Sequence, residues 1–370
     1  MTSSLKEIAE ELNLSISTVS RAINHTGRVS EETRLMVLDA VRRHNYTPNR
    51  VAQSLRQKKT NMVGLIVPDI GDYFSEVIKG TESELSANNY SMILADSHED
   101  PLKEANYIKL MYQSQVDGLI LATVSDNFRW TEIYKKSNIP VMFFDNEPDN
   151  LKCNKVVLNN IKATEIAVDH LVRLGHKNIA LICGNVKEST AKYRREGFIE
   201  AMKKHNLEID YNLIKEGLYY LDAGYSSMEE LILNRGEHPF TAVIASTYRM
   251  SCSAIHAIKD YSFSYPKDFS FIGFDMEDSD RLFSPSITSV LQPGKQIGKL
   301  MVHKLLQSMD HIGLSAEEKS EEDFMVSFIN PVIKIGESTA PVKKQPSPSS
   351  EADPSAGSFQ EPGLSGCPER

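Results

Sequence analysis

Several features that define large classes of proteins are missing from this 370-residue sequence. No apolar run approaches the roughly 18 to 20 residues that a membrane-spanning helix needs. The first residues, MTSSLKEIAEELN, lack the basic and apolar regions of a signal peptide. The four cysteines stand far apart without a Cys-x-x-Cys pair, so the sequence indicates neither a zinc site nor a disulfide framework. We therefore expect a cytoplasmic protein with no membrane partner, no metal and no other cofactor.

The motifs of common enzyme classes are missing as well. There is no Gly-x-Ser-x-Gly turn, no phosphate-binding loop and no His-Glu-x-x-His pair, and the ten histidines are scattered. These absences argue against an enzyme. What the sequence does contain is enough apolar content, 41% against 25% charged residues, to bury a large core, and its length suits about two or three domains.

Positive charge is concentrated at the N-terminal end. Residues 1–60 carry ten Lys and Arg against six Asp and Glu, a net charge of +4, whereas the whole chain carries −9, so the remaining residues carry −13. A small basic segment on a large acidic protein indicates that only this segment meets a polyanion such as DNA. A solvated helical surface would explain the same charge pattern.

The basic segment contains the capping residues of three short helices. Ser4 and Glu7 form a capping box, Ser15 caps a second helix from about Ile16 to Asn24, and Ser30 caps a third. The residues expected to face inward are Leu5, Ile8, Ala9 and Leu12, then Val19, Ala22 and Ile23, and finally Leu35, Val37, Leu38 and Val41. A tight turn between the first two helices predicts a helix-turn-helix unit, in which the second helix lies in the major groove of DNA.

The outer face of this second helix is unusually polar. Short hydroxyl side chains allow a close approach to phosphates and bases, and Arg21 is able to donate two hydrogen bonds to guanine. For Ser15 we favour a capping role, whereas for Ser17, Thr18 and Arg21 we favour DNA over simple solvent exposure. The residues of the head predicted to bind DNA are Ser15, Ile16, Ser17, Thr18, Ser20, Arg21, Asn24 and Arg28.

The segments TVSRAIN, RVSEETR and YTPNRVAQSLRQKKTNMVGLIVP occur in an order and spacing that resembles the lactose-repressor (LacI/GalR) family of bacterial transcription regulators. The resemblance covers about Ser4 to Ile335. It implies a homodimer, with a tetramer as an open alternative, that binds a pseudo-palindromic operator and represses carbohydrate-utilisation genes. It also implies a two-lobed body, similar to periplasmic sugar-binding proteins, that binds a small effector.

Two alternatives to this function stay open. A regulator controlled by a protein co-effector, or one without a small effector, would have the same architecture. A solute-binding protein would share the two-lobed body but needs a signal peptide, where this chain has a capped helical head.

Residues 48–61 are expected to form a hinge between head and body. A helix over Arg50 to Gln57 is barely two turns long, so it would be ordered only by DNA and a second subunit. By the family resemblance, Leu55 is a wedge in the minor groove with Ala52 beside it, and the alternative is a linker residue packed on the body. The predicted DNA-binding residues of the hinge are Asn49, Arg50, Ala52, Leu55 and Lys58.

From Met62 onward, short apolar runs alternate with amphipathic segments. Runs such as MVGLIVPD, VDGLILAT and NIALICGN are typical of parallel strands buried on both faces, which predicts doubly wound α/β lobes. We expect a head at 1–47, a two-lobed body at 62–339 with crossings near 159–160, 290–293 and 322–326, and a tail at 340–370. The tail is rich in Pro, Ser and Gly and is predicted to be disordered.

Effectors of such folds bind where the strands end, in the cleft between the lobes. Carboxylates accept hydrogen bonds from hydroxyls, Arg provides a planar donor fork, and aromatic rings cover apolar sugar faces. An Asp at a strand end would alternatively cap the next helix. The resemblance implies that the effector contacts Tyr73, Phe74, Asp145, Arg194, Tyr219, Thr247, Tyr248 and Asp275.

One departure from the family pattern bears on the effector. Where the family has Asn-Asp before its Met-Ala pair, this chain has Thr247 and Tyr248, followed by Arg249. Replacing the carboxylate by a neutral ring removes a negative charge, which favours a sugar acid or sugar phosphate over a neutral sugar.

Overall fold

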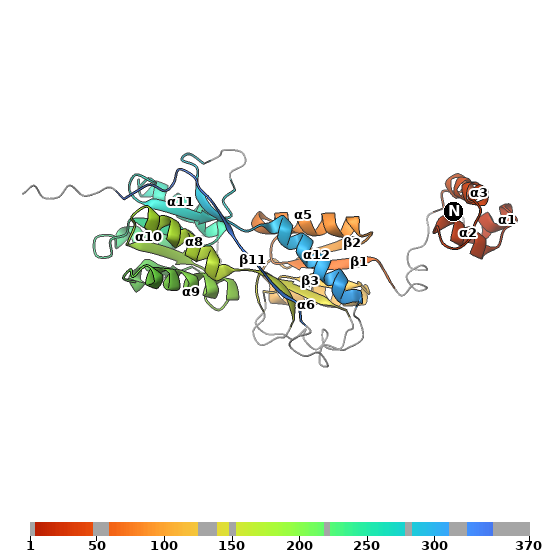
Figure 1. Ribbon diagram of the computed structural model, residues 1–370, viewed down its shortest axis with the longest axis horizontal. Helices are drawn as coiled ribbons and strands as arrows, with labels where there is room; N and C mark the ends of the chain where they lie inside the picture. The colour runs from red at the N-terminus through yellow and green to blue at the C-terminus, as the bar shows by residue number, and fades with distance from the viewer. Residues whose placement is uncertain are drawn as a thin grey trace, which may run out of the picture.

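The computed structural model describes residues 4–46, 59–124, 139–147, 153–217, 223–277, 283–310 and 324–342. Figure 1 shows a helical head followed along the chain by two α/β lobes. The predicted contact residues Asn49, Arg50, Ala52, Leu55, Lys58 and Tyr219 lie outside the described residues. Within the described part of the chain, no helix is long and apolar enough to cross a membrane.

The head contains α1 (Leu5–Glu11), α2 (Ile16–Ile23) and α3 (Glu31–Arg43), each with the predicted serine cap. Its core consists of Ile8, Ala9, Val19, Ala22, Val37 and Ala40. The prediction that Leu35 faces this core is wrong, because its side chain is 62% exposed. Helix α3 buries Val37 and Ala40, and residues two apart on a helix point in different directions, so Leu35 cannot share their face.

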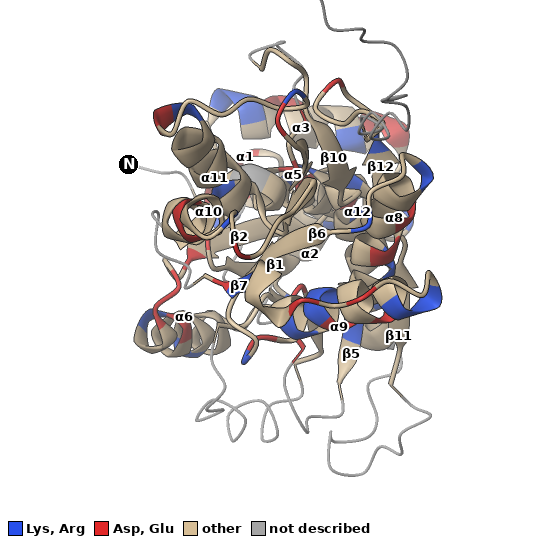
Figure 2. Cartoon of the chain, turned by 90° about the vertical axis from the view of Figure 1, so that its left-hand side faces the viewer, with Lys and Arg blue, Asp and Glu red and all other residues tan. Residues whose placement is uncertain are grey.

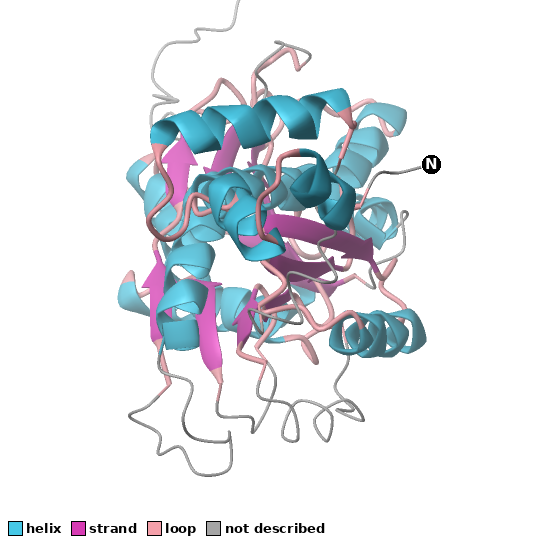
Figure 3. Ribbon diagram, turned by 90° about the vertical axis from the view of Figure 1, so that its right-hand side faces the viewer, coloured by secondary structure: helices cyan, strands magenta, loops and turns pink. Residues whose placement is uncertain are grey.

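The first lobe is built on a six-stranded sheet with the order β11-β5-β4-β3-β1-β2, in which all pairs are parallel. Its strands are β1 (Met62–Val67), β2 (Ser91–Asp96), β3 (Gly118–Leu121), β4 (Val141–Phe144), β5 (Asn154–Leu158) and β11 (Val326–Ile329). Helices α5 (Asp72–Ala87), α6 (Pro101–Gln113) and α12 (Gly294–Asp310) contact strands of this sheet. Figure 3 shows helices lying against strands in the molecule. The central strands are buried except for half-buried Met62 at the start of β1, as their continuous apolar runs predict.

The second lobe repeats this plan with the order β12-β10-β9-β8-β6-β7, in which only the edge strand β12 is antiparallel among the described strands. Its strands are β6 (Ile179–Cys183), β7 (Ile214–Glu216), β8 (Ala242–Ala245), β9 (Ser270–Phe274), β10 (Thr288–Leu291) and β12 (Val332–Lys334). Its helices are α8 (Asn160–Arg173), α9 (Ser189–Lys204), α10 (Ala223–Leu233) and α11 (Tyr248–Asp260), with a 3-10 turn at Tyr211–Leu213. Figure 2 shows charged residues on the outer helices such as α9, whereas the strands are largely uncharged.

The chain passes between the lobes three times. It leaves the first sheet after β5 to form α8, and it returns after β10 to form α12. The predicted third crossing at 322–326 is misplaced, because β11 still pairs in parallel with β5 of the first sheet. The crossing lies at residues 330–331, between β11 and β12.

The second lobe extends past the predicted start of the tail at residue 340. The Ala340 N–H donates to Ser270 Oγ at 3.0 Å, the Ala340 carbonyl bonds His176 Nε2 at 3.0 Å, and the Val342 N–H donates to the Leu174 carbonyl at 3.0 Å. Residues 340–342 are therefore part of the body, since their backbone groups have partners on the second lobe.

Candidate functional site

The predicted DNA-facing residues of α2 lie on the surface of the head. Ser15, Ser17, Arg21 and Arg28 are exposed, and Ile16 is 51% exposed. The Ser15 hydroxyl accepts from the Thr18 N–H at 3.1 Å, so it is occupied as a helix cap. Thr18, Ser20 and Asn24 are half-buried.

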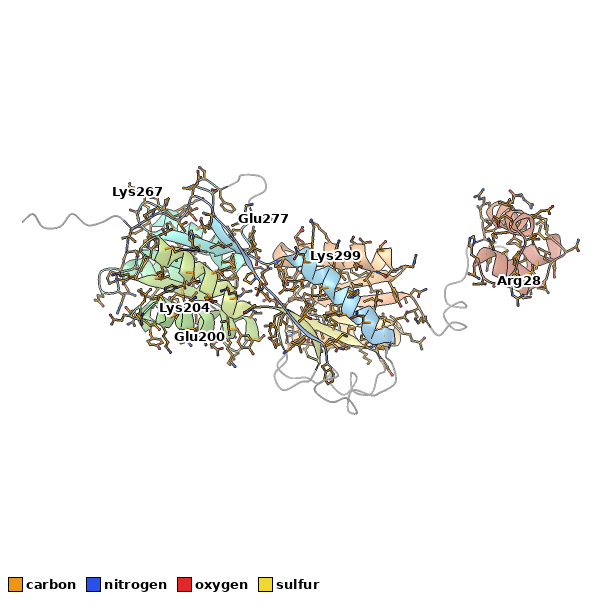
Figure 4. All side chains as sticks on the ribbon, in the orientation of Figure 1. Arg28, Glu200, Lys204, Lys267, Glu277 and Lys299 are labelled. Carbon is orange, nitrogen blue, oxygen red and sulfur yellow. The ribbon has the colours of Figure 1, made fainter. Side chains whose placement is uncertain are left out.

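Arg21 on α2 and Arg28 in the loop that follows it have no ion pair to another described residue. Arg43 pairs with Glu11 at 2.6 Å and with Asp39 at 3.0 Å, which leaves it occupied within the fold. Arg21 and Arg28 take part in none of the head's ion pairs between described residues, and Figure 4 shows Arg28 at the surface of the head. Their charge is therefore available to phosphates or base edges.

The lobes enclose a cavity of about 250 Å³ where strands of both sheets end. Every predicted effector residue that the structure describes lines this cavity, namely Tyr73, Phe74, Asp145, Arg194, Thr247, Tyr248 and Asp275. Residues far apart in the sequence meet there because the carboxyl ends of parallel strands lie at one edge of each sheet.

Asp145 and Asp275 occupy equivalent places in the two lobes. Each directly follows the third strand of its sheet order, β4 or β9, and each has a left-handed backbone, with φ of 63° and 54°. Such a conformation at a residue with a side chain costs about 1 kcal/mol or more, and it is concentrated at binding sites. Burial, together with nearby Asp275, raises the pKa of Asp145 to about 6, although Arg194 opposes the shift.

Arg194 is the cation at the centre of the cleft. It is only 5% exposed, and its side chain comes from α9, where the close crossing with α8 fixes its place. Its Nε donates to Asn160 Oδ1 at 2.8 Å and its Nη1 to the Ser246 carbonyl at 2.6 Å, while the guanidinium lies 4.8 Å from the centre of the Phe274 ring. These contacts hold the guanidinium in one orientation.

The first lobe contributes an aromatic wall from the beginning of α5. The rings of Tyr73 and Phe74 lie 5.1 Å apart, and Phe74 meets Phe144 edge-on at 6.1 Å. Burial raises the pKa of Tyr73 well above its ordinary value, and Asp145 and Asp275 add to this shift. The hydroxyl therefore stays protonated and is able to donate a hydrogen bond.

Comparison with known proteins agrees with both parts of this architecture. Residues 4–49 match the bacterial regulatory proteins of the lacI family, and residues 168–339 match the periplasmic binding protein-like domain. The transcriptional regulator DegA of Bacillus subtilis is 33% identical over 302 residues, 80% of this chain and 89% of DegA. The chain belongs to the LacI family.

Other LacI-family relatives span nearly the whole chain. The probable transcriptional regulator EndR of Paenibacillus polymyxa is 34% identical over 345 residues, 91% of this chain and 98% of EndR. The lac repressor dimer bound to operator and the anti-inducer ONPF superposes with a TM-score of 0.79 at 24% identity, covering 92% of this chain and 100% of that chain. The predicted fold class is confirmed, and this LacI-family protein is a DNA-binding transcriptional regulator whose relatives are regulators too.

The departure from the LacI-family pattern has a structural consequence that the sequence did not indicate. The Thr247 hydroxyl accepts from the Met250 N–H at 3.2 Å and so caps α11. Arg249, two residues later, pairs with Asp69 of the first lobe and lies 4.0 Å from Glu99. Arg249, the cation next to Tyr248, therefore faces carboxylates of the protein itself.

Sequence reasoning missed several residues that line this LacI-family cleft. They are Asp69, Glu99, Asn146, Glu188, Arg249 and Gln292, among others. Each lies within a few residues of a strand or helix end, which is the pattern that could have identified them. Gln292 is bonded to Asp275 through its backbone N–H at 2.9 Å and its side-chain Nε2 at 2.8 Å.

The charge of the cleft is predominantly negative. The ionisable residues that line the cavity are the acids Asp69, Glu99, Asp145, Glu188 and Asp275, the bases Arg194 and Arg249, and the two tyrosines Tyr73 and Tyr248. Both guanidiniums already have partners in the protein. This balance argues against the anionic effector that the loss of a carboxylate at Tyr248 predicted, because several other carboxylates remain.

Proposed function

We propose that this protein binds a pseudo-palindromic operator as a homodimer, through α2 of each head, and represses the adjacent genes. The observation that carries the proposal is the exposed polar face of α2 with Arg21 and Arg28 unpaired among the described residues. A two-fold dimer presents two such helices to two half-sites of the duplex. The likeness to the lac repressor dimer bound to operator supports this assembly.

Operator selection with Arg21→Ala tests this proposal. A bidentate contact to guanine contributes about 1 to 3 kcal/mol of discrimination, so the variant should lose preference at one position in each half-site. Arg42→Ala on α3 is the control, because Arg42 is also exposed but lies outside the proposed recognition helix. Unchanged base preferences in Arg21→Ala would reject the proposed base contact.

We further propose that the cleft binds a small, neutral, polyhydroxylated effector of the sugar class. Asp145 and Asp275 supply hydroxyl acceptors from the two lobes, Arg194 supplies a fixed donor, and Tyr73 and Phe74 supply an apolar wall. An anionic group would enter among the carboxylates of the cleft, where the guanidinium of Arg249 is already paired with Asp69. A cavity of about 250 Å³ suits a small ligand rather than a protein segment.

The contact between Asp275 and Gln292 connects this effector site to a lobe crossing. Gln292 directly follows β10, at the point where the chain returns to the first lobe. A ligand that bonds both Asp145 and Asp275 would favour one angle between the lobes, and so one spacing of the paired heads. Such a ligand shifts the equilibrium between two lobe angles only by the difference between its affinities for the two.

Calorimetry with matched neutral sugars, amino sugars, sugar acids and sugar phosphates on wild type and Arg194→Ala tests the effector class. We expect a neutral sugar to bind, and Arg194→Ala to lose that binding. If only an acidic sugar binds tightly, the effector is anionic, as the loss of a carboxylate at Tyr248 predicted. Binding by none of these ligands would favour a protein co-effector.

A further inference from the structure

Direct contacts between described residues join the lobes on two sides of the cavity. On one side, Asn146 of the first lobe contacts Glu188 at 3.4 Å and the Thr190 hydroxyl at 3.4 Å. On the other side, Arg249 of the second lobe pairs with Asp69 of the first. Asp69 follows β1 and Asn146 follows β4, so one intervening strand separates the two contacts by roughly 10 Å within the sheet.

The side with Arg249 is an ion cluster rather than a single hydrogen bond. The Nη2 group of Arg249 bonds Asp69 Oδ2, and its Nη1 lies 4.0 Å from Glu99 Oε1. The other oxygen of Asp69 accepts from the Gly71 N–H at 2.5 Å, which holds the carboxylate in place. One guanidinium of the second lobe therefore faces two carboxylates from two loops of the first.

The first-lobe half of this cluster is itself fixed. The Glu99 N–H donates to the Pro68 carbonyl at 3.2 Å, so the loops after β1 and β2 are tied together beside Asp69. Glu99 also has a left-handed backbone, with φ of 58°, a conformation that costs energy and needs support from its surroundings. Arg249 thus meets a carboxylate pair that is held in place within the first lobe.

We propose that Arg249, together with Asp69 and Glu99, is a latch that holds the two lobes together before an effector binds. The contact exists only while the lobes keep this angle, because its partners belong to different lobes. The side chains of Arg249 and Asp69 are 41% and 29% exposed, so solvent and salt screen the pair and the latch opens reversibly. It biases the lobes toward the arrangement seen in this structure, independently of the effector's identity.

A distance measurement between the lobes of the full-length protein tests the latch. Spin labels at Glu200→Cys on α9 and Lys299→Cys on α12 report the distance, and Figure 4 shows these two residues at the surfaces of different lobes. Cys252→Ser and Cys367→Ser remove the remaining native thiols outside the two buried positions. Labelled chains are diluted with unlabelled protein, so that distances within one chain dominate.

Without effector, we expect Arg249→Gln and Asp69→Asn each to raise the population of the longer distance roughly two- to fivefold, the effect of losing one partly exposed ion pair. The double variant should open no further than either single variant, because both remove the same contact. Glu99→Gln should have a smaller effect, given its longer distance. Higher salt should open the wild type but leave Arg249→Gln unchanged.

Arg173→Gln is the matched control, since this exposed arginine of the second lobe donates to the Asp169 carbonyl of its own helix. It should leave the distances unchanged. The proposal is overturned if Arg249→Gln and Asp69→Asn keep the wild-type distances at both salt concentrations, if their effects simply multiply in the double variant, or if Arg173→Gln opens the lobes equally.

Discussion

At the scale of single residues, Asp145 shows how the fold changes the chemistry of a side chain. Its carboxyl is placed in the cleft near Asp275, and burial is the main reason that its pKa rises from 3.8 to about 6. The folded protein therefore holds the proton more tightly than the unfolded chain. The stability that this proton contributes is fully present below pH 3.8 and is lost as the pH rises through about 6.

We accordingly expect Asp145→Asn to stabilise the protein at pH 7.5 by about 1 to 2 kcal/mol, less than the full shift would give because the side chain is partly exposed. This gain in stability should be smaller at pH 5, where Asp145 is mostly protonated in the folded protein. Urea unfolding at both pH values measures this difference. For the control Asp268→Asn we expect the opposite effect, a loss of stability at pH 7.5. The hydrogen bond from the Ser264 N–H lowers the pKa of Asp268, so its charged form stabilises the fold. Equal stability of Asp145→Asn and wild type at pH 7.5 would contradict the proposed burial of charge.

At the scale of elements, the crossing of α8 and α9 positions Arg194. The Thr164 hydroxyl of α8 donates to the Arg194 carbonyl at 2.8 Å. Three residues after Arg194, a side chain at Gly197 would place its Cβ 2.4 Å from the Ile161 carbonyl oxygen. The two backbones approach so closely that only glycine fits, and this approach brings the guanidinium into the cleft.

Gly197→Ala should therefore destabilise the protein by about 1 to 3 kcal/mol, the usual effect of overpacking, and should weaken effector binding through Arg194. Gly236→Ala is the matched control, since a Cβ there meets no atom within 4 Å, and its effect should stay within about 0.5 kcal/mol. Thermal and urea unfolding of the two variants gives the comparison. A Gly197→Ala variant as stable as Gly236→Ala would show that the helices separate without cost.

At the scale of the whole molecule, the basic head and the acidic two-lobed body have separate tasks. In the function proposed above, the heads bind DNA through phosphate contacts, and the body sets the spacing of the heads through the angle between its lobes. We therefore expect salt to act on both the head and the body. It weakens the phosphate contacts of the head, and it screens the ion pair between Arg249 and Asp69 in the body.

Operator affinity should fall by about tenfold or more between about 50 and about 200 mM salt, because each neutralised phosphate releases counterions. A protein that lacks residues 1–61 should not bind the operator at all. Fluorescence anisotropy with operator DNA measures both effects. Salt-independent binding, or binding by the truncated body, would contradict the assignment of DNA binding to the head.

The effector and the operator should also change each other's affinity by the same factor, because coupling between two binding equilibria is reciprocal. Calorimetry of the effector with and without operator, and anisotropy of the operator with and without effector, give the two factors. Arg249→Gln should change this factor, because it removes an ion pair between the lobes. Unequal factors in the wild type would mean that a third state or a further partner takes part.

The sequence by itself determined the elements whose physics is local. Serine caps, the polar face of α2 and the continuous apolar runs of the central strands follow from neighbouring residues, so the head and the two α/β lobes could be predicted. Short edge strands such as β7 (Ile214–Glu216) and β12 (Val332–Lys334) were missed, because three residues are too few to show a period. The third crossing was misplaced because β11, at the edge of the first sheet, was not recognised.

The tertiary structure decided which charges meet. From sequence, Arg249 is only a cation beside a departure from the family pattern, and Asp69 stands 180 residues away from it. The fold places both at strand ends on opposite sides of one cleft, where they pair. It likewise gives Asp145 and Asp275 equivalent places in two lobes and raises the pKa of Asp145 by burial. Pairing and burial depend on distances between segments remote in the chain, and no local pattern of residues contains them.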